Sequence, residues 1–239
     1  GFTLSQPALV KNRQPDLTTG DWSNPSVNDW YLVLGSGPRG TTALSEAGSD
    51  QLPKLFAIDL RKLVENSQTA SSQPSYFVTI AGDLPLTLGS DNGFVGGISV
   101  ADWDLNNGDD ALYVGTAETA TAAGSGAVYR IRLTNSAGWL GLSSGTTSLF
   151  SDVNRPLQAA PTTTRDVAGQ RWVLFGTGRL LVPDDNAQSS QEYFFGIKEP
   201  RNADDTFSYG SVDPASLIDT TDVGVFETSG AVRDISSGT

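Results

Sequence analysis

The sequence predicts an all-β protein, and specifically a β-propeller of four-stranded blades in which about three blades are present. Apolar runs of strand length alternate with turn-rich segments, and a set of four such runs recurs three times along the chain. Each set also carries a Gly-Ser/Thr-Gly/Ala motif after its second run. Four-stranded units that repeat in this way are typical of propeller blades. The 26 Gly and 12 Pro in 239 residues suit such a β-rich body.

The three predicted units cover approximately residues 4–80, 94–150 and 157–218. The predicted strands are Leu4–Val10, Trp30–Gly37, Leu55–Leu60 and Tyr76–Ile80 in the first unit, Phe94–Val100, Ala111–Ala117, Ala127–Leu133 and Thr147–Phe150 in the second, and Leu157–Thr163, Trp172–Gly178, Tyr193–Lys198 and a weaker strand between Phe207 and Ile218 in the third.

Each of the three units has a glycine at the end of its second apolar run, namely Gly35, Gly115 and Gly176. The runs before them are apolar at consecutive positions, which predicts strands covered on both faces by neighbouring blades. The run Tyr129–Leu133 alternates instead and predicts a more exposed strand. A generic β-sandwich with coincidental Gly-Thr turns is the alternative, although a threefold recurrence of one strand order favours the propeller.

Three blades do not close a ring, since propellers have roughly four to eight blades. We therefore expect residues 1–239 to form a partial propeller domain whose remaining blades lie in sequence outside this chain or come from a partner. The segment 219–239 is polar and is expected to be either a tail or the start of a further blade. Gly1 stands where Met would begin a complete chain, which fits a processed product or a piece of something longer.

The segment 102–110 carries the clearest chemical signal in the chain. Oxygen-bearing side chains stand at its positions 1, 3, 5 and 9, the spacing at which a tight loop wraps oxygen ligands around calcium. Calcium takes roughly six to eight oxygens, and a solvated Asn-Gly-Asp turn is the alternative interpretation. The predicted ligands are the side chains of Asp102, Asp104, Asn106 and Asp110 and the carbonyl of Gly108.

The loop departs from an EF-hand in two respects. The glycine expected at position 6 stands at position 7, and position 12 holds Tyr113 in place of the bidentate glutamate. Strand-like runs flank the loop on both sides, whereas helices flank an EF-hand. The sequence therefore predicts a strand-loop-strand calcium site, which favours a structural or mechanical role over a sensor that opens a helix pair.

Composition excludes several function classes. The net charge is −12 without any Lys/Arg cluster, so the electrostatic footprint of a nucleic-acid binder or an anionic-membrane binder is missing. The chain has no Cys, His or Met, which removes disulfides, Cys/His zinc sites and every Ser-His or Cys-His relay. There is no apolar run of roughly 18 residues, so we expect neither a membrane span nor a secretory leader.

The runs Trp30–Gly37 and Leu55–Leu60, and above all Trp172–Leu180 with Asp184-Asp185 and Tyr193–Ile197, resemble the C-terminal propeller of the PilY family of type IV pilus biogenesis and tip adhesin proteins. The resemblance implies a modified β-propeller with an EF-hand-like calcium loop that influences pilus extension and retraction. It implies roles in pilus assembly, twitching motility and surface attachment. The implied location is extracellular, at the pilus, and the implied partners are minor pilins and host or abiotic surface ligands.

Some features depart from that family, and alternatives stay open. The family's N-terminal adhesive region and any Arg-Gly-Asp triplet are missing, so integrin binding gains no support. We expect a non-enzymatic role. An FG-GAP-like adhesion propeller is an alternative suggested by the run Phe94–Gly97, and a lectin-like propeller would bind sugar through Trp22 or Trp139. A less favoured alternative is an exported propeller glycosidase that uses a pair of carboxylates.

Overall fold

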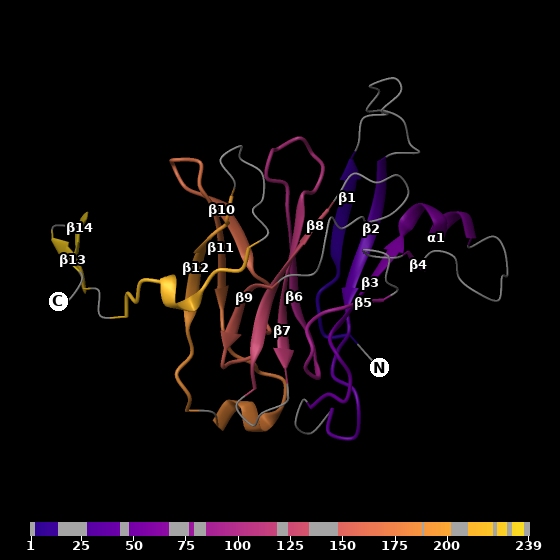
Figure 1. Cartoon of the computed structure of the whole chain (residues 1–239), viewed down its shortest axis with the longest axis horizontal. Coiled ribbons are helices and arrows are strands. Elements are labelled where there is room, and N and C mark those ends of the chain that lie inside the picture. The colour runs from indigo at the N-terminus through magenta and orange to yellow at the C-terminus, as the bar shows by residue number, and fades with distance from the viewer. Residues whose placement is uncertain are drawn as a thin grey trace.

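The computed structural model describes residues 3–13, 28–43, 48–66, 77–78, 85–118, 124–133, 148–187, 189–201, 210–221, 224–228 and 231–236. These residues form mostly antiparallel β-sheet, which confirms the all-β prediction. Three sheets follow one another in chain order, and a separate hairpin comes after them (Figure 1). The described sheets do not close into a ring. No described helix has the length and apolar character to cross a membrane.

The first sheet has the order β1-β2-β3-β4, and the short β5 also pairs with β3. Strict alternation along β3 buries Leu55, Ala57 and Asp59 on one face. The Asp59 side chain then accepts a hydrogen bond from the Lys62 N–H at 2.9 Å, which caps the helix that follows. The elements are β1 (Ala8–Arg13), β2 (Asn28–Gly35), β3 (Lys54–Asp59), α1 (Leu60–Asn66), β4 (Phe77–Val78) and β5 (Leu86–Thr87).

The second sheet is a four-stranded meander in the order β6-β7-β8-β9 and lies between the other two (Figure 1). One face of β7 packs Leu112 and Val114 into a core shared with the first sheet. Its other face packs Ala111 and Tyr113 into a core shared with the third sheet. The strands are β6 (Gly93–Ala101), β7 (Ala111–Glu118), β8 (Gly126–Arg132) and β9 (Ser148–Val153).

The third sheet has the order β10-β11-β12 and, in the described part of the chain, lacks the predicted fourth strand. Residues 210–218 contain no strand and only a short 3-10 helix over Pro214–Ser216, where Pro214 has no N–H to donate and the Asp213 side chain accepts a hydrogen bond from the Ala215 N–H at 2.9 Å. Residues 207–209 lie outside the description. The elements are β10 (Thr162–Arg165), β11 (Arg171–Gly176), η1 (Pro183–Ala187), β12 (Phe194–Lys198) and η2 (Pro214–Ser216).

A hairpin occupies much of the segment 219–239, which was predicted as a tail or the start of a further blade. It consists of β13 (Gly224–Thr228) and β14 (Ala231–Ser236), which pair antiparallel with an irregularity between Phe226 and Glu227. Figure 1 shows it standing apart from the three sheets, and it contacts no other described helix or strand.

Of the expectations about strand exposure, coverage on both faces is confirmed for β7, in which residues 111–117 are all buried. It is wrong for β2, because Trp30 keeps 44% of its surface exposed. The run Tyr129–Leu133 is not an exposed strand, because β8 lies in the buried middle sheet. Arg130 is 4% exposed there, and it satisfies its charge by pairing with the buried carboxylate of Glu199.

Candidate metal centre

The loop 102–110 joins β6 to β7, which confirms the predicted strand-loop-strand arrangement. The two strands pair up to Ala101 and Ala111, and the Asp110 N–H donates to the Ala101 carbonyl at 2.8 Å. Asn107 has a φ of 66°, in the left-handed region that asparagine tolerates better than most residues. Asn107 stands at position 6, where an EF-hand has glycine. Asn107 therefore adopts the left-handed backbone conformation that glycine provides at this position of an EF-hand.

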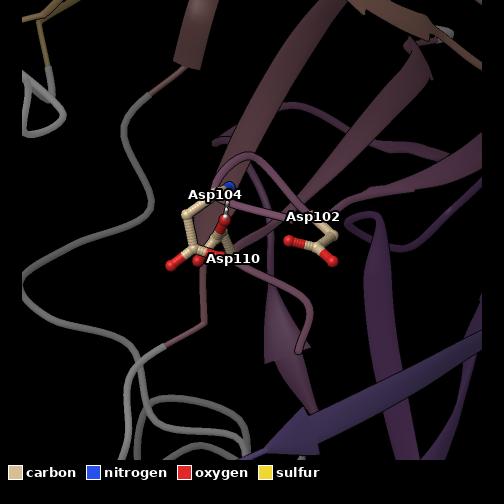
Figure 2. Close-up of side chains that lie close together, drawn as sticks. All are labelled: Asp102, Asp104 and Asp110. Carbon is tan, nitrogen blue, oxygen red and sulfur yellow. Dashed lines mark hydrogen bonds between the residues drawn. The ribbon is translucent and has the colours of Figure 1, made fainter. Parts of the chain in front are cut away.

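Three of the predicted ligands converge at this loop. Asp102, Asp104 and Asp110 each offer a carboxylate oxygen within 4.8 Å of the others. Figure 2 shows Asp104 and Asp110 side by side, with the Asp102 carboxylate directed toward them across the loop. Calcium–oxygen bonds measure about 2.3–2.6 Å, so oxygens on opposite sides of one ion stand about 4.6–5.2 Å apart. The three carboxylates are therefore close enough together to bind one metal ion.

Backbone N–H groups hold the carboxylates in this arrangement. Asp110 Oδ2 accepts hydrogen bonds from the N–H of Trp103 at 2.5 Å and of Asp104 at 3.2 Å. Asp102 Oδ2 accepts from the Asn107 N–H at 2.9 Å. The loop thus folds around its own acidic side chains, so their positions are set before any cation arrives. Such preorganisation reduces the ordering that binding requires.

The other two predicted ligands lie in the same loop. Asn106 donates from its amide Nδ2 to Asp104 Oδ2 at 2.7 Å, and its Oδ1 accepts from the Gly108 N–H at 2.6 Å. Gly108 is buried. Ligation by Asn106 Oδ1 and by the Gly108 carbonyl stays a prediction.

The electrostatics of the loop favour a cation. Burial raises the pKa of Asp110, and the charges of Asp104 and Asp102 raise it further, although the bond from the Trp103 N–H opposes them. A divalent ion among these oxygens would convert mutual repulsion into attraction.

Asp109 was not among the predicted site residues, yet it ties the loop to the first sheet. Its Oδ2 accepts the Lys11 N–H of β1 at 2.5 Å, and its own N–H donates to the Lys11 carbonyl at 2.9 Å. Burial raises the pKa of Asp109, and nearby Asp102 and Asp110 add to the effect. Asp109 and Lys11 are 98 positions apart, so no local sequence pattern predicts their contact.

A buried polar network ties the loop to the third sheet as well. Trp103 donates from Nε1 to the Tyr113 hydroxyl at 3.0 Å, and that hydroxyl donates to Glu199 Oε2 at 2.7 Å. The other carboxylate oxygen of Glu199 accepts from Arg130. Arg171, at the start of β11, lies over the Trp103 ring with its guanidinium carbon 5.4 Å from the centroid. The loop 102–110 therefore contacts elements of all three sheets.

The Tyr113 hydroxyl is the central link of this network. Burial raises its pKa well above the usual value, and the Glu199 charge reinforces the shift, so the hydroxyl stays protonated and donates. Tyr113→Phe leaves the buried Trp103 N–H and Glu199 without this partner. We expect a loss of about 1–3 kcal/mol in the free energy of unfolding, measured by urea denaturation. Tyr193→Phe, on an exposed ring of β12's edge, should change the unfolding free energy by less than about 0.5 kcal/mol.

The aromatic residues of the lectin-like alternative, Trp22 and Trp139, lie outside the described residues. No protein-family model and no curated protein matches this chain. Among solved structures, the chain is similar to the C-terminal domain of Pseudomonas aeruginosa PilY1, with a TM-score of 0.50 and 16% sequence identity over 89% of this chain. The match covers 40% of that chain, so this chain spans less than half of its length. The likeness shows a distant PilY1-like fold.

Proposed function

We propose that this chain is a calcium-binding β-propeller segment of a type IV pilus-associated biogenesis factor or tip adhesin. In this role it supports pilus assembly, twitching motility and surface attachment, and it performs no catalysis. The observation that carries the proposal is the convergence of Asp102, Asp104 and Asp110 in a hairpin loop of a PilY1-like fold. The extracellular location at the pilus, and contacts with minor pilins or surface ligands, follow from the same resemblance.

The sheet arrangement supports the propeller part of the proposal. The first two units each contain four strands in consecutive antiparallel order, and the sheets stack in the order of the chain. The third unit has three such strands in the described range. Blades beyond these three would complete the ring.

Calcium fits this loop by its chemistry. All predicted ligands are oxygens, and carboxylates, an amide and a carbonyl are the donors that hard cations prefer. A bound ion would supply positive charge between the carboxylates of Asp102 and Asp110. These residues flank the loop at its two ends, where β6 stops and β7 starts. The ion would therefore hold the two strand ends together when the hairpin is pulled.

The first test of this proposal measures calcium-dependent stability. If calcium binds only the folded loop, a hundredfold excess over its Kd should stabilise the protein by about 2.7 kcal/mol. Asp102→Ala and Asp110→Ala should each abolish the calcium-dependent rise in Tm. Asp184→Ala, an exposed carboxylate in η1, should keep it. Terbium luminescence sensitised by Trp103 reports binding directly, because that side chain belongs to the loop.

If calcium raises the Tm of both loop variants as much as that of the unchanged protein, calcium does not bind at this loop. A terbium signal that persists in Asp102→Ala with unchanged affinity would lead to the same conclusion.

A further inference from the structure

The third sheet has an apolar face that no described element covers. We call it the open face, and its apolar residues are Trp172, Leu174 and Gly176 of β11 with Phe194 of β12. Lys198 lies on the same face, where it pairs with Trp172 and its Nζ stands 5.2 Å from the centroid of the Trp172 ring. Gly176 and Phe194 are directly paired across the strands, so they share one side of the sheet. Phe194 is 74% exposed, and Trp172 and Leu174 are partly exposed. The opposite side of β11 is buried against the second sheet through Val173 and Phe175.

In the earlier units the corresponding face is covered by the unit that follows. A Cβ added to Gly35 would lie less than 3.0 Å from Val95 at the start of β6, and one added to Gly115 would lie 2.9 Å from the Leu157 carbonyl oxygen. At Gly176 the nearest atoms belong to Phe194 and Tyr193 of the same sheet and are 3.9 Å away. Gly35 and Gly115 are therefore in close contact with the unit that follows them, whereas Gly176 faces open space.

The side chains before each glycine show the same difference. Tyr31 and Val33 precede Gly35 by four and two positions, and both are fully buried. Ala111 and Tyr113 precede Gly115 in the same way and are fully buried too. The matching residues before Gly176, Trp172 and Leu174, are only partly covered.

Backbone hydrogen bonds also join each of the first two units to the unit that follows it. The Ser36 carbonyl, just after Gly35, accepts the Val95 N–H at 2.8 Å. The Thr116 carbonyl, just after Gly115, accepts the Leu157 N–H at 3.0 Å. Thr177 follows Gly176 in the third unit. A following unit would therefore place an N–H against the Thr177 carbonyl and an apolar side chain over Gly176.

The β13–β14 hairpin has the properties of that following unit. It comes next in the chain and pairs antiparallel, as β6 pairs with β7 and β10 with β11. It also contacts no other described element. Leu217 and Phe195, the neighbour of Phe194, both pack against the core between the second and third sheets, and the six residues 218–223 span about 20–22 Å when extended. The hairpin is therefore within reach of the open face.

We propose that the β13–β14 hairpin docks on the open face as the first two strands of a fourth sheet. The hairpin stands apart from the sheets in Figure 1, so the docked arrangement is a second state of the same chain. Docking would cover Phe194, Trp172 and Leu174 in the way that the second and third sheets cover their predecessors. The proposal rests on the propeller part of the proposed function and does not depend on cation binding by the loop 102–110.

Engineered cysteines test this directly, because the chain contains no cysteine of its own. Phe194→Cys is combined with Val225→Cys in one variant and with Phe226→Cys in another, so that both sides of β13 are sampled. Docking should give an intramolecular disulfide in one of the two variants, at least tenfold faster than in a Val167→Cys/Val225→Cys control. Val167 is fully exposed in the β10–β11 turn, at the other end of the sheet.

Equal rates in all three variants would overturn the proposal. Disulfides formed only between molecules would also overturn it, because they would assign the open face to a contact between copies. Mass spectrometry after non-reducing electrophoresis distinguishes these products.

Hydrogen exchange tests the docking without cysteines. Phe194→Glu places a charge on the open face while leaving the buried side of β12 unchanged. If the hairpin docks, its backbone amides in residues 224–236 should exchange at least tenfold faster in this variant than in the unchanged chain. The same exchange rates in both proteins would contradict the docked state.

Discussion

Glu199→Ala is expected to lower the free energy of unfolding by about 3–5 kcal/mol. The Glu199 carboxylate is 4% exposed and accepts hydrogen bonds from Arg130, itself 4% exposed, and from the Tyr113 hydroxyl. Alanine would leave the buried Arg130 guanidinium without its carboxylate and create a cavity beside Tyr113. Removing one partner of a buried ion pair is costly because the remaining charge stays away from water.

Urea denaturation of the purified chain gives the unfolding free energy directly. Glu65→Ala is the matched control, because Glu65 is an exposed glutamate of α1, and its loss should stay within about 0.5 kcal/mol. A combined Arg130→Leu/Glu199→Leu variant should lose less than Glu199→Ala, since it removes both charges together. Equal losses in Glu199→Ala and Glu65→Ala would show that the pair does not hold the second and third sheets together.

The residues of this pair also show where sequence-based prediction stops. The strand runs could be predicted because alternation and apolar runs are local, and β3, β6, β7, β8 and β12 lie close to where the pattern places them. Arg130 was expected in an exposed strand, since its partner lies 69 positions away and no local pattern reveals it. In the described residues 210–218, the expected last strand of the third unit is replaced by the 3-10 helix η2, which has a local cause in Pro214.

The candidate site divides in the same way. The convergence of Asp102, Asp104 and Asp110 could be predicted because a nine-residue loop brings its alternate side chains together. The contact of Asp109 with Lys11 could not be predicted, because it depends on how the first sheet packs beside β6. The spacing of the acidic residues thus predicts which carboxylates converge, whereas the anchoring of the loop follows from tertiary structure.

The close approach of β6 to the third unit leads to the second large prediction. Gly97 lies in β6, and a Cβ added to it would fall less than 3.0 Å from the backbone nitrogen and Cα of Ala160. Ala160 belongs to the segment that leads into β10, so relief requires a shift of backbone. Gly97→Ala should therefore destabilise the protein by about 3 kcal/mol, the upper end of the range for overpacking.

The same strand supplies the control for Gly97→Ala. Ser99 lies two residues further along β6, and its buried Oγ has no hydrogen-bond partner among the described residues. Ser99→Ala should therefore be neutral or slightly stabilising, because it removes a buried polar atom that forms no bond. Gly97→Ala adds one heavy atom to the strand and Ser99→Ala removes one, and only Gly97→Ala is expected to lower the free energy of unfolding. A Gly97→Ala protein with the urea midpoint of Ser99→Ala would show that β6 and the segment before β10 are separated by more space than the structure gives them.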